Sequence, residues 1–195
     1  KAEVNGGQFP RPVTVPHENV AVGIAMGYYL VTGRPQLVMV HVNVGTANAI
    51  CGIMNAWRGN VPILFSAGRT PYTEDGGLLG QRSGEIHWPQ EMRDQGSMLR
   101  EFVKWDYELR HPSQIESVVD RALAIAKSEP CGPVYLTLPR EVLAAAIGPT
   151  KIRSRPPIAP QSPPPADPDT PAPLPQPLGQ VHNPPLLTCN RVRPP

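Results

Sequence analysis

Apolar runs separated by Gly- and Pro-containing turns organise the first three quarters of the chain. Residues 20–31 form an almost wholly apolar run that ends at Thr32-Gly33-Arg34-Pro35, a helix stop, and predict a helix buried on most sides. Residues 37–42 are continuously β-branched or aliphatic, which is typical of a central parallel strand covered on both faces. Helical spacing returns over 45–57, and 61–67 predict a second buried strand.

The rest of this region continues the alternation. Apolar spacing over 112–127 indicates an amphipathic helix, and 134–138 predict a last buried strand. Residues 13–15 and 102–109 are expected to be extended, and a short helix is expected within 89–98. We therefore predict an α/β fold, a doubly wound and mostly parallel sheet with helices on both faces.

The composition changes at Pro149. Of the 27 prolines, 16 lie from Pro149 onward, where no apolar periodicity remains. We predict one domain over residues 1–148, lacking its opening strand and helix at the N-terminus. Residues 149–195 are predicted to be disordered and Pro-rich, either a native linker or, as the favoured interpretation, an out-of-frame stretch; a proline-rich ligand segment is a third possibility.

Charge and cysteine content exclude several classes of protein. The net charge is +2 and no basic cluster precedes the tail, so a nucleic-acid partner is not expected. Three cysteines without framework spacing predict reduced thiols in the cytoplasm and no metal site. No apolar run approaches the roughly 20 residues of a membrane span, so no membrane association is expected.

Two segments carry candidate chemistry. Glu18 stands at the start of the apolar helix, and His41 begins a run, 41–48, that follows a predicted strand. Ligands of open α/β sheets bind at the carboxyl ends of strands, where Gly45 would allow close backbone approach. A plain alternative exists for each: acidic residues are favoured at helix N-termini by the helix dipole, and strand-Gly-helix turns are commonly structural.

Residues 16–143 together resemble the pyrimidine-binding domain of the thiamine diphosphate-dependent enzymes, the family of acetolactate synthase, pyruvate oxidase and benzoylformate decarboxylase. No single segment decides this, but their order along the chain is specific. The segments are His17-Glu18, Thr32-Gly33-Arg34-Pro35, Gly45-Thr46-Ala47-Asn48-Ala49, Asn55-Ala56-Trp57, Ser66-Ala67-Gly68, Trp88-Pro89-Gln90-Glu91, Val103-Lys104-Trp105, Arg121-Ala122 and 132–139.

The resemblance implies a cofactor, thiamine diphosphate, and a role for each matching residue. Glu18 would bind the pyrimidine ring nitrogen and activate the cofactor, with a pKa raised by burial. Val44, Gly45 and Asn48 fall where the family holds the pyrimidine, and Gln90 where acetolactate synthases place an active-site glutamine. Mg²⁺ would bind through a separate C-terminal domain that this sequence does not contain.

His41 bears on the reaction. Acetolactate synthases usually have a small residue at this position, whereas benzoylformate decarboxylase has a histidine that acts as an acid or base near the substrate. His41 therefore favours a decarboxylase, with a core histidine bonded to backbone groups as the alternative. His17, His87 and His111 are expected to be structural or solvent-facing.

The resemblance further implies a 2-oxo acid substrate and a homo-oligomer whose active site is shared between chains. This chain alone is expected to be inactive. The rival interpretation is a non-catalytic remnant, or a dimerisation module, that keeps only the fold; Gly23 and Gly27 on one helix face would suit either packing within the chain or an interface.

Overall fold

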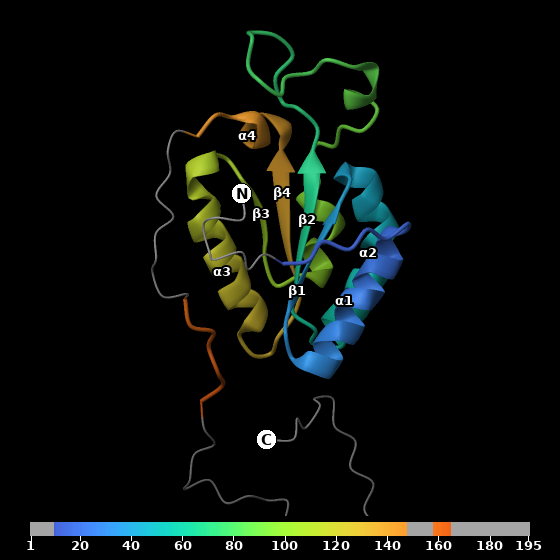
Figure 1. The fold of residues 1–195 in the computed structure, drawn as a ribbon, viewed down its shortest axis with the longest axis vertical. Coiled ribbons are helices and arrows are strands. Elements are labelled where there is room, and N and C mark those ends of the chain that lie inside the picture. Colours follow the sequence, from blue (N-terminus) through green and yellow to red (C-terminus); the bar gives the residue numbers. More distant parts are fainter. Residues whose placement is uncertain (1–9, 148–157, 165–195) are drawn as a thin grey trace, which may run out of the picture.

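A four-stranded parallel sheet forms the centre of the computed structural model, which describes residues 10–147 and 158–164 (Figure 1). The strand order is β1-β2-β4-β3. The strands are β1 Gln36–Val40, β2 Ile63–Arg69, β3 Asp106–Glu108 and β4 Val134–Pro139, and the helices are α1 Glu18–Thr32, α2 Val42–Arg58, α3 Ile115–Lys127 and α4 Arg140–Ala144.

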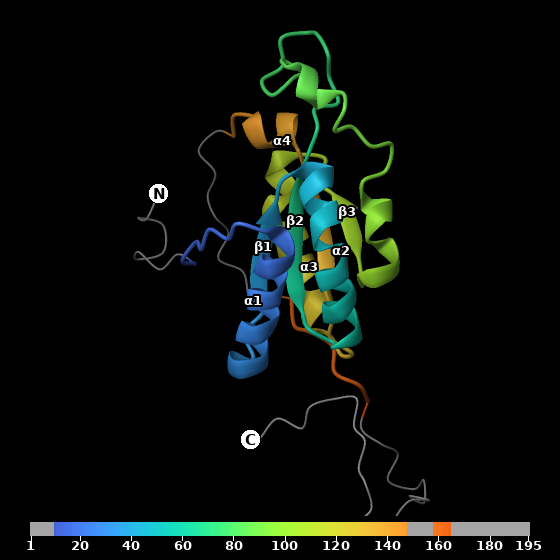
Figure 2. The same cartoon turned by 90° about the vertical axis from the view of Figure 1, so that its right-hand side faces the viewer.

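Helices cover both faces of the sheet, as predicted (Figures 1 and 2). Alternate residues of β2 point to opposite faces: Phe65 joins the core beneath α1 and α2, while Leu64 joins the core beneath α3. In β4, Tyr135 lies in the first core, where its ring stacks on Phe65 with centroids 5.4 Å apart. Because every strand pair is parallel, the carboxyl ends meet at one edge, where α2 and α4 begin.

The prediction that residues 37–42 are covered on both faces is wrong. β1 is an edge strand, and its Leu37 and Met39 side chains are 61% and 72% exposed. The helix over 20–31 is likewise not buried on most sides, since α1 buries only Val22, Ala25 and Tyr29. An apolar run shows that a segment avoids water, but within the described residues nothing covers the outer face of either element.

Three shorter predictions also need correction. Residues 13–15 form no strand. In place of a helix over 89–98, the chain makes isolated 3-10 turns, Glu85–His87, Gly96–Met98 and Arg100–Phe102, because Pro89 and Gly96 interrupt any longer helix. The strand expected over 102–109 shortens to β3, which pairs with β4 over only three residues.

Residues 158–164 run along the end of α3 without forming a helix or strand. The Gln161 N–H donates to Ser128 Oγ over 2.9 Å, and the Glu129 N–H donates to the Gln161 carbonyl over 3.0 Å. The domain division at 148/149 stays a prediction, and the rest of the predicted tail lies outside the described residues.

Candidate functional site

The first two turns of α2 bring four of the predicted site residues together. The helix begins at Val42, three residues earlier than expected, with His41 as its N-cap. Positions 41, 44, 45 and 48 are spaced as neighbours on one helix face. His41, Val44 and Asn48 are exposed, Val44 to 50%, while Gly45 is buried.

Glu18 meets this face from the first turn of α1. The Asn48 Nδ2 donates to Glu18 Oε2 over 3.1 Å. A Cβ on Gly45 would lie 3.3 Å from Glu18 Oε1 and 2.9 Å from Val40 Cβ, so a side chain at this position would displace the carboxylate. The structure thus places Glu18 against the segment in which the sequence predicted its partners.

Gly52 also belongs to this helix contact, although no motif in the sequence singles it out. A Cβ there would lie 2.5 Å from Asn19 Oδ1 and 2.9 Å from Val22 Cγ1. Gly23 and Gly27, which the sequence suggested for close packing, have no described atom within 4 Å of their Cβ positions. Gly45 and Gly52, seven residues apart on α2, are therefore the positions that let α1 approach.

Glu18 is less buried than the family resemblance implied. Its side chain is only partly covered, and its pKa is lowered, because a backbone hydrogen bond and the Asn48 amide both stabilise the carboxylate. The weaker desolvation acts in the opposite direction, and the charges of His17 and His41 add smaller lowering effects. The expected raised pKa is therefore wrong for this chain.

We expect the Glu18 carboxylate to titrate below the ordinary glutamate value in the 195-residue chain, as followed by ¹³C NMR. Asn48→Ala should raise the midpoint toward that value, because the second-largest stabilising contact is lost. Since the folded-state pKa is depressed, Glu18 contributes stability above its unfolded pKa and loses it as the pH falls through the folded pKa. An unchanged midpoint in Asn48→Ala would show that the amide does not hold the carboxylate.

His41 lies at the carboxyl edge with its side chain free of the backbone. The His41 side chain is exposed. Although His41 is the N-cap residue of α2, its side chain makes no capping hydrogen bond and no hydrogen bond with the other described residues. The alternative of a core histidine bonded to backbone groups is therefore wrong. Val42, immediately after it, has a φ of 36°, which is rare for a β-branched residue and allows the sharp turn from β1 into α2.

A buried network ties this turn to the sheet. Thr46 Oγ1 donates to the Val42 carbonyl over 2.8 Å and lies 2.7 Å from the Tyr135 hydroxyl. Gln95 Nε2 donates to the same hydroxyl over 2.9 Å and to the Gly68 carbonyl over 2.9 Å. Burial raises the pKa of Tyr135, so the hydroxyl stays protonated and keeps its hydrogen-bonding role.

Gln90 is the predicted site residue that the structure does not join to the others. It lies half-buried in the long segment between β2 and β3, where its N–H donates to the Ile86 carbonyl over 3.3 Å. Its side chain makes no hydrogen bond with Glu18, His41 or Asn48 in the described part of the chain. The other predicted histidines are structural, since His17 and His111 cap helix starts and His87 Nδ1 accepts from the Ser83 N–H.

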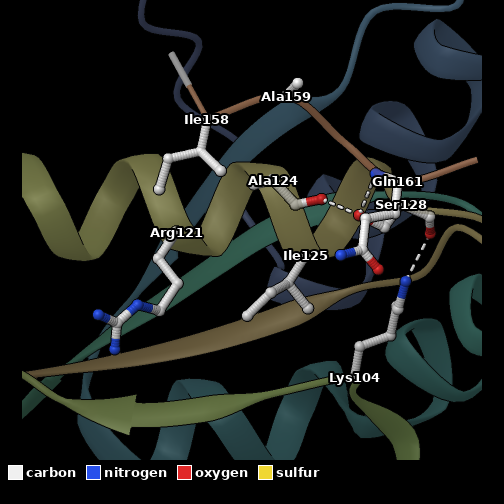
Figure 3. Close-up of a pocket in the computed structure, with 8 residues that line it drawn as sticks. All are labelled: Lys104, Arg121, Ala124, Ile125, Ser128, Ile158, Ala159 and Gln161. Atoms are coloured by element: carbon white, nitrogen blue, oxygen red, sulfur yellow. Dashed lines mark hydrogen bonds between the residues drawn. The ribbon is translucent and has the colours of Figure 1, made fainter. Parts of the chain in front are cut away.

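A small cavity of about 320 Å³ lies at the opposite, amino-terminal edge (Figure 3). Lys104 and Ser128 line it, and the Lys104 Nζ donates to the Ser128 carbonyl over 2.5 Å. Burial lowers the pKa of Lys104. The cavity borders the C-terminal end of α3, where the helix dipole disfavours anions, and we assign it no chemistry.

Gly45→Ala is expected to lower the free energy of unfolding by about 1–3 kcal/mol, since the new methyl group would overlap Val40 and press on Glu18. Gly23→Ala is the matched control in α1: no described atom lies within 4 Å of its Cβ, so alanine should raise helix stability by up to about 1 kcal/mol. Urea unfolding of the 195-residue chain measures both. Equal stabilisation by the two alanines would contradict the close contact at Gly45.

Comparison with known proteins decides the family. Residues 3–98 match the family model described as "Thiamine pyrophosphate enzyme, N-terminal TPP binding domain". The chain carries a domain of this thiamine pyrophosphate-binding family. All six predicted site residues fall inside the matched region: Glu18, His41, Val44, Gly45, Asn48 and Gln90.

The domain is similar to both branches that the sequence suggested. It is 29% identical over 123 residues to benzoylformate decarboxylase of Pseudomonas aeruginosa, covering 63% of this chain and 22% of that protein. It is 31% identical over 134 residues to acetolactate synthase isozyme 3 large subunit of Escherichia coli, covering 69% and 22%. The solved benzoylformate decarboxylase of Polynucleobacter necessarius superposes with a TM-score of 0.58 at 26% identity, covering 71% and 24%.

The chain therefore spans less than a quarter of the length of these curated relatives. Among the residues that the structure describes, no helix is long and apolar enough to cross a membrane. No cluster of three or more His, Cys, Asp or Glu side chains occurs there that could hold a metal ion. Cys51 and Cys131 are free thiols, and Cys189 lies outside the described residues.

Proposed function

We propose that the domain forms the pyrimidine side of a thiamine diphosphate site in a 2-oxo acid decarboxylase or carboligase. The observation that carries this proposal is the Glu18 carboxylate, held by Asn48 and lying over the side-chain-free surface of Gly45. A helix-dipole role would explain an acid at this position but not its amide partner 30 residues away.

The residues present fit a flat, polar heterocycle. Gly45 leaves room beside the carboxylate that any larger side chain would fill, Val44 offers an exposed apolar contact, and Asn48 offers amide hydrogen-bonding groups. Bound thiamine diphosphate would supply the electron sink for loss of carbon dioxide from a 2-oxo acid. The described residues offer no metal cluster, so the proposed Mg²⁺ and diphosphate would be held elsewhere.

Each residue of this chain would have a separate task. Glu18 would exchange a proton with the pyrimidine ring nitrogen and so activate the cofactor, which requires a pKa higher than the exposed carboxylate now has. Covering the site would raise that pKa by desolvation. The His41 side chain is exposed and has no hydrogen-bond partner among the described residues. It would act as acid or base on the substrate, which favours the decarboxylase branch.

The proposed covering is a second chain. On α1, apolar side chains are exposed along one face, on which Gly23 and Gly27 also lie: Val20, Ile24, Tyr28 and Val31 are 51%, 52%, 45% and 87% exposed. Apolar surface of this kind marks interaction sites. The proposed assembly is a cytoplasmic homo-oligomer in which two chains share each active site.

The same exposed face favours a second candidate function, a dimerisation module without catalysis. In that case the packing face of α1 would matter, and the Glu18 carboxylate would not. Substitutions at Glu18 separate the two candidates.

The test compares the full-length polypeptide that carries this domain with the 195-residue chain alone. We expect the former to release carbon dioxide from benzoylformate or pyruvate only when thiamine diphosphate and Mg²⁺ are present. The 195-residue chain should release none, because its described residues offer no group of His, Cys, Asp or Glu side chains that could hold the metal ion. Absence of cofactor-dependent turnover with a panel of 2-oxo acids would overturn the proposed function.

A further inference from the structure

Hydrogen bonds link the segment between β2 and Gln90 to the start of α4. The Thr73 N–H and Oγ1–H both donate to Glu141 Oε1, over 2.9 and 2.6 Å. Glu141 is only 5% exposed, and these bonds replace the water that Oε1 loses, while Oε2 has no hydrogen-bond partner among the described residues. A buried carboxylate of this kind fixes the point at which the segment leaves the sheet.

Arg140, the neighbour of Glu141, holds the same segment further along. Its Nη1 donates to the Gln81 carbonyl over 3.3 Å and to Ser83 Oγ over 3.2 Å. Gly80, with a φ of 91°, passes so close that a Cβ would lie 2.7 Å from the Arg140 carbonyl oxygen. Figure 1 shows the segment rising beyond the arrowheads of β2 and β4, beside α4.

Arg82 lies at the centre of this arrangement. Its side chain is only 4% exposed, and its backbone N–H donates to the Thr73 carbonyl over 2.9 Å. The guanidinium forms an ion pair with Glu91 through Nη2 and donates to the His87 carbonyl through Nη1 over 3.3 Å. Its Cζ lies 5.3 Å from the centre of the Trp88 ring, at cation–π distance.

These contacts bracket Gln90. Trp88 and Glu91, two residues before it and one after it, both contact one buried cation, and Arg69 Nη1 donates to the Met92 carbonyl over 3.0 Å. A planar guanidinium can make an in-plane ion pair and a ring contact at once, which a lysine ammonium cannot. Removing it would leave Glu91 and the turn around Gln90 without their common partner.

We propose that Arg82 is a positioning residue that holds the turn 87–91, and thereby Gln90, at the carboxyl edge of the sheet. This inference rests on the proposed function and on the expectation, from the family resemblance, that Gln90 belongs to the active site. Arg82 acts through Gln90 and needs no contact with substrate or cofactor.

Amide hydrogen exchange of the 195-residue chain tests the structural part. Arg82→Lys and Arg82→Met should each speed exchange at the Trp88, Gln90 and Glu91 amides by about tenfold or more, because their turn hydrogen bonds lose the cation that orders them. Arg93→Met is the control: Arg93 is exposed, lies three residues after Gln90, and has no hydrogen bond or ion pair with other described residues.

Glu91→Gln covers the case in which removing the Arg82 charge unfolds the domain. The Glu91 side chain is 42% exposed, so the change removes the ion pair and leaves the buried side of Arg82 in place. Exchange should then rise across 87–91 while the β4 amides stay protected. Unchanged exchange across 87–91 in the Arg82 and Glu91 variants would overturn the proposal.

A double-mutant cycle in the full-length polypeptide tests the functional part. If Arg82 acts through Gln90, Arg82→Lys and Gln90→Ala should each lower kcat/KM, and the double variant should be no slower than Gln90→Ala. Additive losses would overturn the positioning role while leaving Gln90 in the site. If Gln90→Ala has no effect although exchange has risen, the expected active-site role of Gln90 fails, and with it this inference, while the proposed function of Glu18 still stands.

Discussion

Glu18→Gln is expected to lower cofactor-dependent turnover of the full-length enzyme by about 10²–10⁴-fold, the usual worth of a positioned proton-transfer group. Glutamine has nearly the same shape and can keep a hydrogen bond to Asn48, so the contact between α1 and α2 should survive. What it cannot do is exchange a proton with the pyrimidine ring. Release of carbon dioxide at saturating thiamine diphosphate measures the loss.

Glu101→Gln supplies the control for this substitution, since Glu101 is an exposed carboxylate in a 3-10 turn away from α1. It should leave turnover unchanged. The thermal midpoint of Glu18→Gln should also stay close to that of the parent protein. Equal turnover in Glu18→Gln and Glu101→Gln would contradict the proposed proton exchange by Glu18 and favour the dimerisation module.

His41→Ala is expected to slow decarboxylation by about 10²–10⁴-fold while cofactor affinity changes little. The His41 side chain is exposed and has no hydrogen-bond partner among the described residues, so its removal should not disturb the fold. The rate with benzoylformate and the apparent cofactor affinity should be measured together.

His111→Ala is the matched control, because His111 is an exposed helix cap at a distance in sequence from α1 and α2. It should reduce stability slightly and leave the rate unchanged. Weaker cofactor binding in His41→Ala with intact turnover at saturation would make His41 a packing residue. The acetolactate synthase-like alternative would then be favoured.

Much of the sheet could be predicted from the sequence because parallel strands buried on both faces have a clear pattern. β2 and β4 lie within one or two residues of their predicted positions. β1 has the same continuous apolar pattern but lies at the edge. Apolar side chains indicate that a surface is to be covered, but they do not indicate whether the same chain or another one covers it.

The candidate site, too, could be predicted only in part from the sequence. Glu18 and Gly45 stood out near predicted helix starts, whereas Asn48 was selected only through the family resemblance. The structure places Asn48 and Gly45 against Glu18. Arg82 was missed because a single arginine in a Gly-rich segment has no periodicity to reveal that it is buried. The lowered pKa of Glu18 was missed because it depends on hydrogen bonds and exposure that appear only in the folded chain.

A crystal structure of the full-length enzyme with bound cofactor would show directly whether Glu18 binds the pyrimidine ring of thiamine diphosphate. We predict a Glu18 carboxylate oxygen within about 2.6–3.2 Å of a pyrimidine ring nitrogen, with Val44 and Asn48 beside the ring. A cofactor bound with its pyrimidine away from Glu18, and the carboxylate pointing into solvent, would contradict the account.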